Sequence, residues 1–299
     1  DFAAALKTAL VDVRRFGITA YIEPGLSERH LEAYRDAEQA GKLTAHVLAS
    51  LSPIGSEAGR FGDEIFDLVA KRATYQGKYL HTDSVKVYID GVIETRTSFM
   101  LQPYTDGSNF APFYPADELA VLYQRLDAMG LQIHTHAIGD AAIRLALDAY
   151  EHARQQNGPN DNRHQIVHLQ LIDAKDIPRF AALDVAANFQ CLWCYPDDYI
   201  DVAVGLVGTE RVNRFYPVAS IARSGGRIVG GSDWDVSSLN PLDAIETAVT
   251  RQNPYTNEGR VLGSSENVDL KLALEMYTRN AARVMRLDAL TGSIEVGKR

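Results

Sequence analysis

Apolar residues follow two spacings along the chain: short runs that are typical of strands, and intervals of three or four residues that are typical of helices. Leu6, Leu10 and Val13, for example, share one face of a helix that the spacing predicts over 2–15. The short runs predict strands over 18–22, 43–49, 84–89, 131–136, 165–168, 185–190 and 227–231. The helical patterns cover 2–15, 27–40, 63–73, 116–129, 140–155, 174–183, 200–224, 241–251 and 268–285. Strands and helices therefore alternate along the chain.

This alternation predicts an α/β fold, and we expect a TIM (β/α)8 barrel that forms a single domain over residues 1–299. The leading helix has no strand before it, so we expect the first strand of the barrel to be missing from this chain. Both ends of the sequence look cut, which predicts an internal portion of a longer protein. A doubly wound open sheet is the competing architecture, but no G-x-G-x-x-G pattern follows any predicted strand.

Composition narrows the class of protein further. Hydrophobic residues make up 46% and charged residues 23% of the 299 positions, which is ordinary globular usage. The net charge of −9 and the lack of a basic stripe argue against nucleic acid or an anionic membrane as a partner. We find no long apolar run and no signal peptide, and only two cysteines. We therefore expect a reducing, cytoplasmic location and a small-molecule substrate.

Four residues with reactive side chains lie in or just after predicted strands. Lys86 lies within the strand 84–89, His136 and His168 end two later strands, and Asp233 follows the strand 227–231. In α/β barrels the carboxyl ends of the strands carry the catalytic groups. We therefore expect these four side chains to converge on one point.

This combination has a chemical logic. Imidazole and carboxylate groups are ligands of divalent metals such as zinc, and a bound water can lose a proton near neutral pH. A lysine ammonium cannot bind a metal, but burial lowers its pKa, and the neutral amine can react with carbon dioxide to give an anionic carbamate. Such a carbamate can bridge two metals. An aspartate next to the metal can pass a proton to a leaving nitrogen.

The chain resembles the amidohydrolase superfamily, in particular the branch that includes N-substituted formamide deformylase. The matching stretches are 85–91 with Arg96-Thr97, 136–140, 163–172, 231–234, 278–282 and 292–298. The resemblance implies that Lys86 is a carboxylated bridging lysine and that His136 and His168 are metal ligands. It implies that Asp233 is a metal ligand and the catalytic aspartate at the metal. One or two divalent metal ions, zinc in the first place, are expected on the same ground. The oligomeric state stays open at the level of sequence, with a homodimer as the habit of relatives.

The sequence departs from the family pattern at several points. The family's first metal-binding element is a His-x-His pair at the end of the first strand, and His134-Thr135-His136 belongs to a later strand. The small β-sandwich of relatives is missing apart from the lead-in at 292–298. Val167 stands where relatives often have an acid, and Asp235 where they often have proline. The last two departures bear on substrate preference.

Other polar or reactive residues have weaker assignments. His134 is expected to support the ligands or the core, and Asp140 to cap the helix that follows it. Cys191 and Cys194 are expected to line the pocket, and Glu23 either faces the pocket or is a loop acid. Three loop side chains are candidates for substrate contact: Arg96, Tyr104 and Trp193.

These expectations lead to a metal-dependent hydrolase that cleaves an amide-type C–N bond, with Lys86 and Asp233 as catalytic residues. Two alternatives stay open at the level of sequence. The same site can hydrolyse an ester, a lactone or a phosphoester, or the chain is a non-catalytic barrel that lacks the His-x-His pair. Metal content distinguishes the last alternative from the others.

Overall fold

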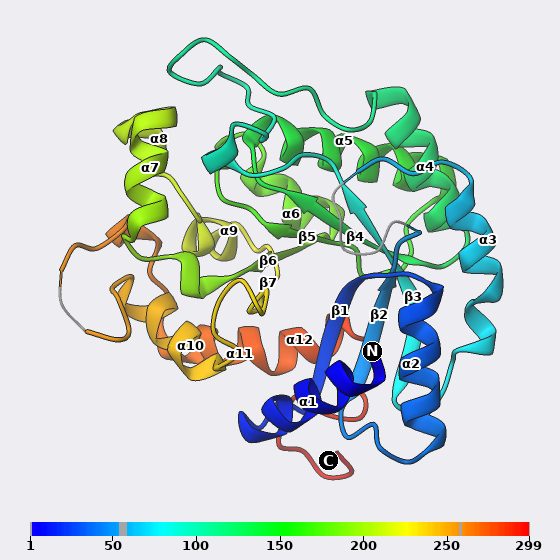
Figure 1. The fold of residues 1–299 in the computed structure, drawn as a ribbon. Helices are drawn as coiled ribbons and strands as arrows, with labels where there is room; N and C mark the ends of the chain where they lie inside the picture. The colour runs from blue at the N-terminus through cyan, green and yellow to red at the C-terminus, as the bar shows by residue number, and fades with distance from the viewer. Residues whose placement is uncertain (1, 54–58, 257–258, 299) are drawn as a thin grey trace.

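The computed structural model describes residues 2–53, 59–256 and 259–298, which form one curled sheet surrounded by helices (Figure 1). Seven parallel strands lie in the order of the sequence, each paired with the next. The strands are β1 (Ala20–Leu26), β2 (His46–Leu51), β3 (Leu80–Tyr88), β4 (Gln132–Ala137), β5 (Gln165–His168), β6 (Ala186–Phe189) and β7 (Ile228–Gly230). The α/β class is therefore confirmed.

Helices connect successive strands and lie around the outside of the sheet (Figure 1). The α-helices are α1 (Phe2–Arg15), α2 (Glu28–Gln39), α3 (Glu64–Lys71), α4 (Ala116–Ala128), α5 (Asp140–Asn157), α6 (Ile177–Leu183), α7 (Asp198–Val207), α8 (Thr209–Val212), α9 (Val218–Arg223), α10 (Pro241–Thr250), α11 (Leu270–Tyr277) and α12 (Arg279–Val284). Short 3₁₀ turns are η1 (Arg72–Thr74), η2 (Ile93–Thr95), η3 (Cys191–Trp193) and η4 (Ser264–Glu266).

The sequential strand order is that of a barrel rather than of a doubly wound sheet, whose order reverses at its middle. Within the described residues β1 pairs only with β2 and β7 only with β6, so what the structure shows is an open, curled sheet. The strand predicted over 18–22 is Ala20–Leu26, shifted toward the carboxyl end. Residues 292–297 form bends, irregular backbone and one turn, and no strand.

The sheet is buried on both faces because helices cover one side and the other side faces its own interior. All six residues of β4 are buried, as is typical of a parallel strand that is covered on both faces. At the amino end of the sheet the interior is filled by apolar side chains, among them Leu48, Met285 and Leu287. The Gln132 side-chain amide donates to the backbone oxygen of Val284 and thereby ties this apolar cluster to the sheet. Polar side chains are thus left to the carboxyl end.

Strand pairing sets the relative heights of the residues with reactive side chains. Lys86 lies opposite His134, Tyr88 opposite His136, and Ala137 opposite His168. Because side chains in a strand alternate between faces, Lys86, Tyr88, His134 and His136 all point to the same side of the sheet.

No helix in the described part of the chain is both long enough and apolar enough to cross a membrane.

Candidate active site

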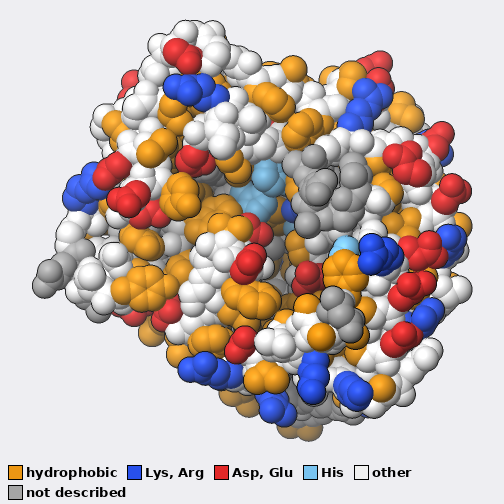
Figure 2. All heavy atoms as spheres, in the orientation of Figure 1, with side chains coloured by type: hydrophobic (Ala, Val, Ile, Leu, Met, Phe, Trp, Pro, Cys, Tyr) orange, Lys and Arg blue, Asp and Glu red, His pale blue; other side chains and the backbone are white. Residues whose placement is uncertain are grey.

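Two histidines form the centre of the site. The ring centroids of His136, in β4, and His168, at the end of β5, lie 4.5 Å apart. Both residues are buried, with 8% and 6% of their surface exposed. In Figure 2, histidine side chains are visible at the bottom of a hollow near the centre of the face shown, with acidic side chains close to them. The structure thus brings together the two histidines that the sequence analysis selected as ligands.

Each imidazole is held by one ring nitrogen. His136 Nε2 lies 3.1 Å from the backbone oxygen of Gly91 and 3.7 Å from a carboxyl oxygen of Asp90. His168 Nδ1 lies 2.8 Å from the side-chain oxygen of Gln190. A histidine that donates one N–H to such an acceptor presents its other nitrogen as a metal ligand. The acceptors therefore select Nδ1 of His136 and Nε2 of His168 for that role.

Both histidines are kept neutral. Burial, together with the nearby Lys86 charge, lowers the pKa of His136 to about 3. Burial likewise holds the pKa of His168 well below its ordinary value, with His136 and Lys86 as further causes. A neutral imidazole has a lone pair to donate, so the electrostatics of the hollow favour the metal-binding form.

Lys86 lies inside the sheet next to the histidines. Its side chain is buried, and its Nζ lies 5.0 Å from the ring centroid of Tyr88. Burial lowers the pKa of Lys86 to about 7, although the carboxylate of Asp233 acts in the opposite direction. A substantial share of this amine is therefore unprotonated near neutral pH, which is the state that can react with carbon dioxide.

Asp233 follows β7 and lies on the same side of the sheet. The pKa of Asp233 is raised, mainly by burial and in addition by the charge of Asp235. The Lys86 ammonium acts in the opposite direction. Its backbone φ of 52° lies in the left-handed region, an uncommon conformation for a residue other than glycine. Such strain is concentrated at functional sites, where the surrounding structure over-determines it.

Asp90 is an important residue that the sequence analysis did not select. Its buried carboxylate accepts the backbone N–H groups of Phe99, Ile138 and Gly139 at 2.9–3.0 Å. It thereby joins the loop 91–114 to the turn after β4. Burial raises its pKa to about 7, while the three N–H groups oppose that shift. The signal in the sequence was its position directly after the lysine strand.

Asp140 has a different role from the predicted helix cap. It is the first residue of α5, and Gly139 occupies the N-cap position. The Asp140 carboxylate accepts the backbone N–H of Leu101 at 2.8 Å as well as that of Ala141. The prediction was wrong by one position because the helix begins at Asp140 itself, so that the cap position falls on Gly139.

Glu23 does not enter the hollow. The neighbouring residue Ile22 points into the sheet interior, where it packs against the apolar cluster around Leu48. Because side chains alternate along a strand, Glu23 lies on the opposite face, together with Tyr21. On that face it is hydrogen-bonded to Tyr34 of α2. Burial raises its pKa to about 7. The carboxyl group is thus packed between the sheet and a helix.

Several secondary candidates turn out to be structural. His134 is buried, with Nδ1 3.1 Å from Ser50 Oγ, as expected of a core histidine. The Tyr104 hydroxyl bonds the backbone of Ser98 within its own loop, so Tyr104 is not free to contact a substrate. Cys191 and Cys194 are unpaired and fully buried in the apolar core, and do not line the hollow.

The other two loop candidates differ in position. Arg96 forms an ion pair with Asp106 at 3.1 Å, which holds it within the loop 91–114. Trp193 in η3 stacks on the His168 ring at 5.4 Å, with an angle of 8° between the planes. Trp193 is thus the candidate that lies directly at the histidine pair.

The donor set fits a metal site in part. No three histidine, cysteine, aspartate or glutamate side chains among the described residues lie close enough to one another to hold an ion. The hollow offers two imidazoles with one nitrogen each available, and the buried amine of Lys86. These residues fit one metal ion held by His136, His168 and a carboxylated Lys86, whereas the ligand role of Asp233 stays a prediction.

Comparison with known proteins gives a consistent result. The sequence model of the amidohydrolase family matches residues 1–299. Protein LONG AFTER FAR-RED 3 of Arabidopsis thaliana is 32% identical over 240 residues, which are 78% of this chain and 40% of that protein. N-substituted formamide deformylase of Arthrobacter pascens is 25% identical over 304 residues, 98% of this chain and 53% of that protein.

One solved structure is similar over nearly the whole chain. An uncharacterized metal-dependent hydrolase from Pyrococcus furiosus has a TM-score of 0.82 and 26% sequence identity, and the match covers 99% of this chain and 58% of that one. The chain thus spans about half the length of these relatives.

Proposed function

The chain belongs to the amidohydrolase family, and on this premise we propose that it is a metal-dependent hydrolase that cleaves an amide-type carbon–nitrogen bond. The observation that carries the proposal is the pair of neutral histidines beside a buried lysine at the carboxyl end of a parallel sheet. We further propose that the curled sheet is the larger part of a (β/α)8 barrel, since its strands follow one another in barrel order.

Lys86, His136 and His168 would hold a divalent metal, with zinc as the favoured ion. Such an ion, when bound, would polarise a carbonyl oxygen and lower the pKa of a bound water to about 7. The neutral Lys86 amine would add to the carbon of carbon dioxide and lose a proton to water, which leaves an anionic carbamate as a metal ligand. The N–H groups of both imidazoles stay directed at Gly91 and Gln190, which fixes the ring orientations.

Asp233 would move the proton. Its raised pKa makes its carboxyl group easier to protonate than that of an ordinary aspartate, which suits a group that takes up a proton and releases it again. In amide hydrolysis the leaving nitrogen must receive a proton to depart as an amine. A partly buried aspartate in electrostatic contact with Lys86 is suited to transfer that proton.

The bond type follows from the relative rather than from the hollow itself. The name of the Arthrobacter pascens relative specifies an N-substituted formamide as its substrate. A small N-acyl amine is therefore the first substrate class to test. Esters and lactones react through the same tetrahedral intermediate without needing protonation of a leaving nitrogen, so they are the comparison substrates.

The test combines metal analysis with a substrate panel. The purified protein, reconstituted with zinc and bicarbonate, is expected to bind metal and to hydrolyse N-substituted formamides faster than matched esters. Lys86→Met should lose both properties, whereas Lys78→Met, which removes an exposed lysine, should keep them. Metal-free protein after reconstitution would show a non-catalytic barrel. Metal binding together with faster hydrolysis of esters than of formamides would show that the site belongs to an ester or lactone hydrolase.

A further inference from the structure

One carboxylate on the loop that contacts His136 has no part in the proposed chemistry. Glu94 lies in η2, three residues beyond Gly91, whose backbone oxygen contacts His136. Its Oε1 accepts the side-chain amide of Gln170 at 3.2 Å. Gln170 in turn lies two residues beyond His168. Glu94 therefore joins the loop that follows the lysine strand to the loop that follows the second histidine.

The charge of Glu94 has no cationic partner in the described part of the chain. Arg96, two residues further along the same loop, forms an ion pair with Asp106 at 3.1 Å. Gln170 supplies one neutral donor, and a carboxylate has room for about four hydrogen bonds. A half-buried carboxylate with one amide donor is incompletely compensated, so a cation that enters the hollow would gain from meeting it.

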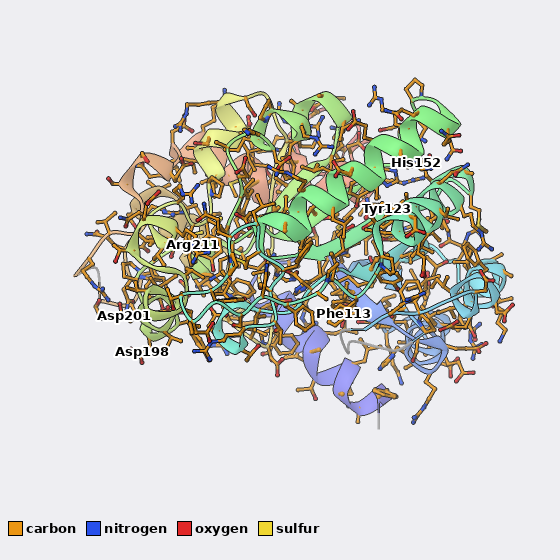
Figure 3. All side chains as sticks on the ribbon, turned by 90° about the horizontal axis from the view of Figure 1, so that it is seen from above. Phe113, Tyr123, His152, Asp198, Asp201 and Arg211 are labelled. Carbon is orange, nitrogen blue, oxygen red and sulfur yellow. The ribbon has the colours of Figure 1, made fainter. Side chains whose placement is uncertain are left out.

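The loop that carries Glu94 is held firmly in place. Arg211, labelled in Figure 3, donates to the backbone oxygens of Gln102 and Pro103 at 2.8 and 3.0 Å. Asp90 fixes the same loop from the other side through Phe99. A carboxylate on a fixed loop loses little entropy when it binds a ligand, which favours a role in recognition.

Aromatic rings complete the surroundings. The charge of Glu94 also acts on the phenols of Tyr104 and Tyr216, but both side chains are buried and are not open to a ligand. The Tyr216 backbone N–H also donates to the backbone oxygen of Gln170 at 2.9 Å. Trp193, stacked on His168, adds an indole face to the wall of the hollow. A carboxylate together with the face of the half-buried Trp193 indole is a typical environment for an organic ammonium group.

We propose that Glu94 binds a cationic group of the substrate, so that the preferred substrates are N-acyl amines that carry a second, protonated amine. This inference rests on the proposed function for the identity of the scissile bond. It makes Glu94 a specificity-determining residue that contacts the substrate and leaves the reacting atoms to the lysine–histidine group. The acyl group would then lie at the histidine pair while the ammonium lies at Glu94 and Gln170.

The first test measures binding and needs no turnover. Pentylammonium and its neutral counterpart pentan-1-ol are titrated into the protein, with Trp193 fluorescence or calorimetry as the readout. We expect pentylammonium to bind at least about tenfold more tightly, and Glu94→Gln to remove that preference. Asp117→Asn, which removes an exposed carboxylate from the first turn of α4, should keep it. Equal binding of the two probes, or an unchanged preference in Glu94→Gln, would overturn the inference.

The second test separates this inference from the proposed function. Mono-N-formyl-1,5-diaminopentane and N-formylpentylamine are compared as substrates. Glu94→Gln is expected to raise KM for the charged substrate about tenfold or more, with kcat and the neutral substrate little changed. Hydrolysis of both substrates with no such difference would refute the role of Glu94 and leave the hydrolase standing. No hydrolysis of either, together with selective ammonium binding, would refute the hydrolase and retain the cation site.

Discussion

At the scale of single residues, the geometry of the site depends on acceptors outside the ligand set. His168 is oriented by Gln190, whose oxygen lies 2.8 Å from Nδ1. Removing such an acceptor typically lowers metal affinity by about 10- to 100-fold, because the ring and its tautomer are no longer fixed. We expect Gln190→Leu to show a loss of that size when zinc affinity is measured by competition with a chelator.

The matched variant is Gln190→Glu, which keeps an acceptor oxygen at the same position. It should retain most of the zinc affinity that Gln190→Leu loses. Gln190 is buried and also contacts Asn188, so the melting temperature of each variant must be recorded. Equal affinity in the wild type and in folded Gln190→Leu would show that Gln190 does not position His168 for metal binding.

A second residue-scale effect concerns Glu23 and pH. Burial raises its pKa to about 7 from an ordinary 4.5, so the folded protein holds this proton more tightly than the unfolded chain. Stability from this group is therefore complete below about pH 4.5 and is lost as the pH rises to about 7. At pH 8 we expect Glu23→Gln to be about 1–3 kcal/mol more stable relative to wild type than it is at pH 4.5, as measured by urea unfolding.

The control for this prediction lies in the neighbouring helix. Glu32→Gln removes an exposed carboxylate from α2, where Tyr34 contacts Glu23, and should give the same difference from wild type at both pH values. If Glu23→Gln also shows a difference that is constant with pH, the carboxyl group of Glu23 titrates at its ordinary pKa in the folded protein.

At the scale of elements, the site depends on how closely the loop 91–114 approaches α5. A Cβ on Gly139 would lie only 2.1 Å from the backbone oxygen of Phe99. The loop or the helix would have to move, so we expect Gly139→Ala to lower the free energy of unfolding by about 1–3 kcal/mol. Gly205→Ala in α7 is the comparison, because no atom lies within 4 Å of the added methyl. That variant should be stabilised by about 0.5–1 kcal/mol in the same urea measurement.

The same scale shows where sequence reasoning succeeds. Strong periodicity predicted α5 and β4 nearly to the residue, because their apolar positions are set by burial alone. It ended the first strand too early, at Ile22, before Pro24, a residue that weakens a strand prediction. Pro24 is tolerated in β1 because, within the described residues, this strand pairs on one side only and its missing N–H need not reach a partner.

Other features had no local signal. The helix predicted over 268–285 is interrupted at Thr278, whose φ of −124° and ψ of −93° are not helical. Gln190 and Asp90 act on histidines from other strands, at separations of 22 and 46 residues. Such contacts arise only when the sheet is assembled, so they are visible in the structure and not in the spacing of residue types.

At the scale of the whole molecule, the site connects strands that are far apart in the sequence. Lys86, His136 and His168 lie on β3, β4 and β5, and Asp233 follows β7. The family resemblance placed all four together, and the structure places the first three next to one another. A metal bound there would link three neighbouring strands and thereby stabilise the folded chain as a whole.

This linkage can be measured without any substrate. At a zinc concentration of about 100 times Kd, a ligand that binds only the folded state adds about 2.7 kcal/mol, which corresponds to a rise in Tm of about 5 °C or more for a chain of this size. We expect that rise in the presence of bicarbonate, and its loss in His136→Ala. His152→Ala is the control, because His152 lies on the outer helix α5, away from the hollow, with Gln124 as its side-chain neighbour (Figure 3). A rise that survives in His136→Ala but disappears in His152→Ala would place the metal outside the sheet and remove the basis for the lysine–histidine site.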